Sequence, residues 1–121
     1  MHELSIAISL IELASEELAR QGGGRVTELH LKLGPLCGVE PEALQSAYEL
    51  ARERSALATA KLVIEHVPVQ INCPRCRRAR EVKSIQEMRC RVCGAPSAQI
   101  VHGRELELVA MEICDEASEV S

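Results

Sequence analysis

Aromatic side chains are almost absent from this sequence, which has no Trp, no Phe and a single Tyr among 121 residues. A hydrophobic core must therefore be packed from Leu, Ile, Val, Ala and Met, which bury less apolar surface per side chain than aromatic rings do. Because a short chain with such a core gains little stability from burial alone, we expect an additional stabilising cross-link, such as a bound metal ion or disulfides.

The amino-terminal region has no basic leader and no long apolar run. Its most apolar stretch, LSIAISLIELA, is interrupted by Ser5, Ser9 and Glu12, which argues against a secretion signal or a membrane span. We therefore expect a cytoplasmic protein. In that reducing environment cysteines bind metal more often than they form disulfides.

Signatures of catalysis are also missing from the sequence. It contains no paired carboxylates, no nucleophile beside a general base and no phosphate-binding loop. Acid–base catalysis, nucleophilic catalysis and nucleotide hydrolysis depend on such arrangements. We therefore do not expect an enzyme.

Cysteines, in contrast, are frequent, and four of the six form two close pairs. CPRC supplies Cys73 and Cys76, and CRVC supplies Cys90 and Cys93, with thirteen residues between the pairs. Two residues between paired cysteines let both thiolates of a tight turn bind one ion, and two such turns complete a tetrahedron. We expect structural zinc at this site. The alternatives are a rubredoxin-like iron site, disulfides or free thiols.

The other cysteines and most histidines stand alone in the sequence. Cys37 and Cys114 are expected to be ordinary thiols. His30, His66 and His102 are expected at the surface, or in support of other groups, rather than as metal ligands.

Basic side chains are concentrated around the cysteine pairs. The whole chain has a net charge of −4, yet residues 73–93 contain seven basic and two acidic side chains. Zinc with four thiolates contributes about −2, so this segment keeps a charge of about +3. Such a segment could contact an acidic protein surface or simply be solvated. Nucleic acid is a weaker candidate, because no aromatic ring lies here to stack on bases.

Hydrophobic periodicity divides the rest of the chain into two helices and three strands. Apolar side chains three and four residues apart predict helices over residues 3–21 and 41–55. Alternating apolar and polar side chains predict strands over residues 25–33, 61–67 and 104–113. We therefore predict an α+β fold in which two helices lie on a small, mainly antiparallel sheet, with an inserted four-cysteine, zinc-ribbon-like subdomain.

The first three residues, Met1, His2 and Glu3, form a tripeptide that can chelate a metal ion. The α-amino group, the His2 backbone nitrogen and the His2 imidazole can close adjacent five- and six-membered rings around one ion. Nitrogen ligands in a plane favour Ni(II) or Cu(II) over zinc, and Glu3 can add an oxygen. Taken alone, a histidine at this position is more often incidental.

Several motifs together resemble the HypA/HybF family of hydrogenase nickel-incorporation proteins. The resemblance covers nearly the whole chain, and the pairing of MHE with two CxxC pairs is its most specific part. It is carried by MHELSIA at the start, GPLCGVEPEAL at residues 34–44, AKLVIEHVP at residues 60–68, CPRC, CRVC, and GRELEL at residues 103–108.

The resemblance implies two metal sites with different roles. Nickel would be held by Met1, His2 and Glu3, and structural zinc by the four paired cysteines, Cys73, Cys76, Cys90 and Cys93. It also implies delivery of nickel to the large subunit of a [NiFe]-hydrogenase together with a partner GTPase, which must be another protein. The alternative is a zinc-ribbon adaptor that docks on protein or nucleic acid and has no nickel role.

These expectations define a domain organisation. Residues 1–71 would form a nickel-binding α+β domain, completed by the returning strand at residues 104–113. Residues 72–103 would form the zinc-binding subdomain. Residues 114–121 have no pattern and are expected to be a disordered tail.

Overall fold

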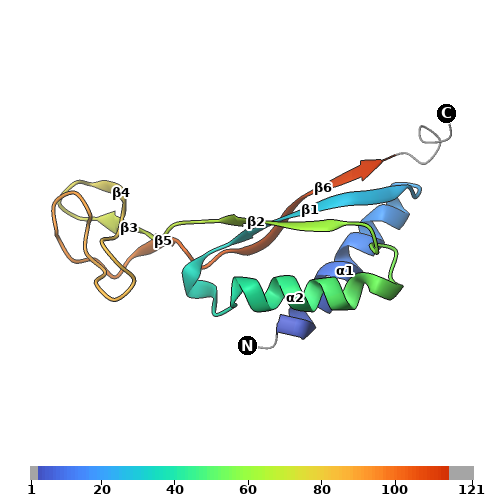
Figure 1. Ribbon diagram of the computed structural model, residues 1–121. Helices are drawn as coiled ribbons and strands as arrows, with labels where there is room; N and C mark the ends of the chain where they lie inside the picture. Colours follow the sequence, from blue (N-terminus) through green and yellow to red (C-terminus); the bar gives the residue numbers. More distant parts are fainter. Residues whose placement is uncertain (1–2, 115–121) are drawn as a thin grey trace. The chain divides into compact units, whose positions relative to one another are not determined.

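The computed structural model describes residues 3–114, which contain two α-helices and two three-stranded sheets (Figure 1). The predicted α+β class, with two helices and small antiparallel sheets, is confirmed. The described residues divide into two compact units. Unit 1 contains residues 3–31, 39–65 and 107–114, and unit 2 contains residues 32–38 and 66–106.

Two helices and most of a three-stranded sheet make up unit 1. The helices are α1 (Glu3–Arg20) and α2 (Pro41–Ala51), which pack on each other. Pro41 lies at the start of α2, where its missing amide proton costs no hydrogen bond. The helix predicted over residues 41–55 is shorter than expected, because Arg52–Arg54 form a 3₁₀ turn.

The sheet has the strand order β2-β1-β6, which places β1 in its centre. Its strands are β1 (Arg25–Leu33), β2 (Lys61–His66) and β6 (Leu106–Cys114). The β1 strand buries alternate leucines, Leu29, Leu31 and Leu33, as its pattern predicts. The predicted disordered tail lies outside the described residues from 115 onward, whereas Cys114 is the last residue of β6.

The single aromatic residue, Tyr48, is completely buried in the core of unit 1. Its hydroxyl donates a hydrogen bond to the carbonyl of Ala60 at 3.0 Å, and its burial raises the pKa of the phenol. The α1 helix contributes a stripe of buried side chains at helical spacing, Ala7, Leu10, Ile11, Ala14 and Leu18. The core is therefore aliphatic around one ring.

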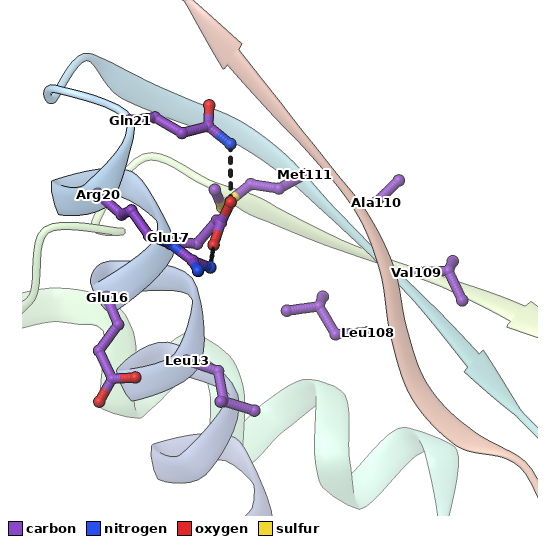
Figure 2. Close-up of a pocket in the computed structure, with 9 residues that line it drawn as sticks. All are labelled: Leu13, Glu16, Glu17, Arg20, Gln21, Leu108, Val109, Ala110 and Met111. Atoms are coloured by element: carbon purple, nitrogen blue, oxygen red, sulfur yellow. Dashed lines mark hydrogen bonds and ion pairs between the residues drawn. The ribbon is translucent and has the colours of Figure 1, made fainter.

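None of the β6 residues is buried, although apolar and polar residues alternate along much of the strand. Val109 is 45% exposed, and Leu13 of α1 is 55% exposed. Both line an open groove of about 710 Å³ in unit 1 between the carboxyl half of α1 and residues 108–111 of β6 (Figure 2). On the α1 side of the groove, Glu17 accepts hydrogen bonds from Arg20 and Gln21. In the described residues β6 is an edge strand, so only part of its surface is covered.

Unit 2 contains a second sheet that the sequence did not predict. Its strands are β3 (Gln70–Cys73), β4 (Arg78–Glu81) and β5 (Ile100–His102), and β3 pairs antiparallel with both neighbours. Strands of three or four residues are too short to reveal an alternation of two. The completely buried side chains of this unit are few, and they include Ile71, Cys73 and Cys90.

Two loops of unit 2 meet at Gly34 and Gly103. The amide of Gly34 donates to the carbonyl of Glu105 at 2.9 Å, and the amide of Leu36 donates to the carbonyl of Gly103 at 2.7 Å. A Cβ atom on Gly34 would lie 2.2 Å from the carbonyl group of Gly103. Only a residue without a side chain allows the two backbones to approach so closely.

The Glu105 carboxylate stabilises the loop at Gly103. It accepts a hydrogen bond from the Gly103 amide at 2.7 Å and lies 2.8 Å from Nδ1 of His102. The contact with His102, followed by the Gly103 amide, lowers the pKa of Glu105. His102 therefore supports a loop of unit 2, in agreement with the role expected from the sequence.

Candidate metal centre

Both CxxC segments form the same tight turn. In the first, the amide of Cys76 donates to Sγ of Cys73 at 3.3 Å, and the amide of the following residue donates to the Cys73 carbonyl at 2.8 Å. In the second, the amide of Cys93 donates to Sγ of Cys90 at 3.5 Å, and the amide of Gly94 donates to the Cys90 carbonyl at 2.8 Å. Because each turn holds two sulfur atoms and donates an amide hydrogen bond to one of them, it presents a half-site that favours thiolates.

The residue after each pair adopts a left-handed backbone conformation. Gly94 has a φ of 79°, as glycine allows without strain. Arg77 has a φ of 59° and is the only non-glycine residue with a positive φ in the described chain. This conformation costs a residue with a side chain about 1–2 kcal/mol, so the turn geometry is imposed on Arg77 by its surroundings.

The four sulfur atoms converge on one point. They lie within 4.8 Å of one another, with Sγ separations of 3.4 Å for Cys73 and Cys93 and 3.9 Å for Cys76 and Cys90. Tetrahedral zinc with bonds of about 2.3 Å requires separations of about 3.8 Å. A disulfide requires about 2.05 Å. All four residues are free thiols, so the donor set and spacing fit a structural zinc ion.

The cysteine thiols of this cluster differ in pKa. The amide of Cys76 is the main cause that lowers the pKa of Cys73. Burial is the largest effect on Cys90 and opposes ionisation, but two backbone amides and the neighbouring thiols outweigh it and lower its pKa to about 6. The amide of Ala95 favours the Cys93 thiolate, yet burial and the other thiols raise its pKa to about 11. Full ionisation therefore needs a cation among the four sulfurs.

The amino-terminal tripeptide is only partly described. Met1 and His2 lie outside the described residues. Glu3 is the first residue of α1, and its carboxylate accepts a hydrogen bond from the amide of Glu40 at 3.2 Å. The carboxylate of Glu3 is therefore placed beside the start of α2.

The structure also brings together three potential metal ligands that sequence reasoning missed. Glu28 and His30 of β1 lie beside Glu112 of β6, and their ligand atoms are within 4.8 Å of one another. Glu112 is more than 80 residues from His30 in the sequence, so no local spacing could reveal the group. Predicting the group would have required knowing the register in which β1 and β6 pair.

Basic side chains surround the four-cysteine site, as the sequence predicts. Arg91 lies 3.9 Å from Glu81, and Arg89 lies 3.8 Å from Glu87. These distances are at the limit of an ion pair, and surface pairs of this kind contribute little stability. The exposed basic side chains around the site are Arg75, Arg77, Arg78, Lys83, Arg89 and Arg91.

Comparison with known proteins relates nearly the whole sequence to one protein family. A family model described as "Hydrogenase/urease nickel incorporation, metallochaperone, hypA" matches residues 1–113. The hydrogenase maturation factor HypA of Chloroflexus aurantiacus is 46% identical over 112 residues, which cover 93% of this chain and 98% of that protein. HypA of Roseiflexus sp. (strain RS-1) is 43% identical over 121 residues, covering 100% and 98%.

Solved structures agree with this comparison. The solution structure of the Ni metallochaperone HypA from Helicobacter pylori has a TM-score of 0.65 and 25% identity, over 95% of this chain and 99% of that one. No helix among residues 3–114 is long and apolar enough to cross a membrane. The four-cysteine site, the fold and the match over residues 1–113 lead to one conclusion. The chain belongs to the HypA family of hydrogenase and urease nickel-incorporation proteins, metallochaperones rather than enzymes, with a four-cysteine site for structural zinc.

Proposed function

We propose that this chain binds Ni(II) at Met1, His2 and Glu3 and delivers it in the cytoplasm to the large subunit of a [NiFe]-hydrogenase, together with a partner GTPase. Zinc is assigned to Cys73, Cys76, Cys90 and Cys93. The observation that carries the proposal is the closed four-thiolate cluster within a chain that matches a nickel-incorporation family from residue 1. Four thiolates saturate a tetrahedral ion, so the cargo must be held elsewhere.

Zinc has a structural role in this proposal. Unit 2 buries few apolar side chains completely, and two of its buried residues are the ligands Cys73 and Cys90. A unit with so small a core needs metal binding as part of its folding free energy. The zinc ion would therefore fix the geometry of the exposed arginines, which form a surface for an acidic partner.

Nickel has a transient role. An α-amino group, a deprotonated backbone nitrogen and an imidazole form a chelate that needs no preformed cavity. A ligand set with open positions can exchange with the ligands of an acceptor protein, whereas the zinc site cannot do so without losing its fold. The carboxylate of Glu3, beside the start of α2, would add an oxygen ligand or orient the others.

Adding three glycines before Met1 tests the nickel site, because a single glycine would make His2 the third residue and complete a new chelate of amine, two backbone nitrogens and imidazole. The extension displaces the α-amino group from the chelate, so nickel affinity should fall at least about tenfold while zinc content is unchanged. Calorimetric nickel titration of the zinc-loaded, untagged protein measures this change. A chain with three glycines added after Ser121 is the matched control. Equal nickel affinity in all three proteins would reject the terminal site and favour the zinc-ribbon adaptor.

Zinc affinity is expected to fall as the pH is lowered, and more steeply below about pH 6. At neutral pH zinc must displace the proton of Cys93, whose pKa is about 11 without metal. The lowered pKa of Cys90, about 6, stabilises the ionised cluster above that pH, and this contribution is lost as the pH falls through it. Competition with a chromophoric chelator between pH 8 and 5 measures the slope. A zinc affinity independent of pH would contradict the thiolate assignment.

A further inference from the structure

We propose that unit 1 contains a second, weaker site for a divalent transition-metal ion, formed by Glu28, His30 and Glu112. The site is separate from both sites of the proposed function, because it shares no residue with the amino-terminal tripeptide or with the four cysteines. It would take a borderline ion such as Ni(II), Co(II) or Zn(II). Its donors are one imidazole and two carboxylates, the ligand types that such ions accept.

The sheet positions these three side chains on one face. Glu28 and His30 are two residues apart on β1, so they point to the same side, while Leu29 and Leu31 between and after them are buried on the other. Glu112 lies on the neighbouring strand β6. The hydroxyl of Thr27 donates to the Glu112 carbonyl at 3.2 Å, which fixes β6 beside β1 at this point.

The distances match a coordination shell closely. Nε2 of His30 lies 3.1 Å from Oε1 of Glu28 and 3.9 Å from Oε2 of Glu112. Around an ion with bonds of about 2.1 Å, adjacent ligand atoms are about 3.0 Å apart in an octahedron and about 3.4 Å apart in a tetrahedron. The first pair already fits. The second pair must approach by about 0.5 Å for a tetrahedron or about 0.9 Å for an octahedron, which the side chain of Glu112, 61% exposed, can do.

Charge and exposure decide how strongly the ion would bind. Two carboxylates around a neutral imidazole attract a dication, and binding replaces their mutual repulsion by attraction. The side chains of His30 and Glu28 are 31% and 35% exposed, so water competes for the ion. Three protein ligands also leave coordination positions to water. The site should therefore bind more weakly than the four-thiolate site and exchange its ion rapidly.

A simpler interpretation is an ion pair between His30 and Glu28 without metal, and the two can be separated by experiment. The zinc-loaded chain with three glycines before Met1 is titrated with Ni(II), so that the α-amino group is too far from His2 to share a chelate with it. The ring signals of the four histidines are followed by NMR, with zinc content measured in parallel. We expect the His30 ring to shift or broaden at nickel concentrations that leave His66 and His102 unchanged.

Variants complete the test. Exchanging His30→Asn or Glu112→Gln should lower the calorimetric affinity of this second nickel event at least about tenfold, whereas His66→Asn, an exposed histidine at the end of β2, should leave it unchanged. Backbone spectra without nickel verify that each variant is folded. Equal broadening of all histidine rings, or an affinity unchanged by His30→Asn, would overturn the proposal. A response confined to the His2 ring would also overturn it, because it would mean that the extended terminus still binds nickel and that the second site does not exist.

Discussion

Replacing Cys90 by serine is expected to lower zinc affinity at least about a thousandfold and to unfold unit 2 while the helices of unit 1 persist. The Cys90 side chain is completely buried, and its Sγ lies 3.9 Å from Sγ of Cys76. A serine hydroxyl stays protonated and is a poor zinc ligand, so the ion would lose a quarter of its shell. Structural zinc contributes about 10–16 kcal/mol in small domains, of which a thousandfold loss is about 4 kcal/mol.

Chelator competition gives the affinity, and amide hydrogen exchange shows which unit opens. Cys37→Ser is the matched control, since Cys37 is a partly buried free thiol in a 3₁₀ turn outside the cluster. That control should retain full zinc content and the protection of unit 2. If the Cys90 variant bound zinc as tightly as the unchanged chain, the four-thiolate assignment would have to be abandoned.

Replacing Gly34 by alanine is expected to destabilise the zinc-loaded protein by at least about 3 kcal/mol, because overpacking against backbone is among the costliest single changes. The new Cβ would lie 2.2 Å from both carbonyl atoms of Gly103, and backbone cannot move aside as a flexible side chain does. The hydrogen bonds from Gly34 to Glu105 and from Leu36 to Gly103 would be lost as the loops separate. Urea unfolding at fixed zinc concentration measures the difference.

Gly22→Ala separates this clash from an effect of backbone conformation alone. Gly22 has a φ of +95°, but a Cβ there would have nothing within 4 Å. That variant should cost only about 1 kcal/mol, the price of a left-handed backbone. Comparable losses in the two variants would show that contact between the loops of unit 2 is not the cause.

The contrast between the two units explains what could be predicted from sequence. Polar and apolar residues alternate over residues 28–33 of β1, and α1 repeats its apolar stripe over 18 residues, so both periods could be recognised. The strands of unit 2 have four, four and three residues and are held by a metal site and by loop contacts, neither of which leaves a period.

The same reasoning applies to the sites. Cys73, Cys76, Cys90 and Cys93 could be identified because CxxC spacing is a local consequence of ligand geometry. The junction of Gly34 with Gly103, and the meeting of His30 with Glu112, depend on pairing between distant segments. Such contacts follow from the register of strands and loops, which one sequence does not specify.

The lone tyrosine makes it possible to follow unit 1 separately from unit 2 by optical spectroscopy. Tyr48, buried in unit 1 and bonded to Ala60, is the source of near-ultraviolet aromatic absorption and of intrinsic fluorescence in a chain without Trp or Phe. After exchange of zinc for Co(II), the thiolate-to-metal transitions of the cysteine cluster would report on unit 2. Each unit thus carries its own chromophore, and the melting of one can be recorded without labels while the other is still folded.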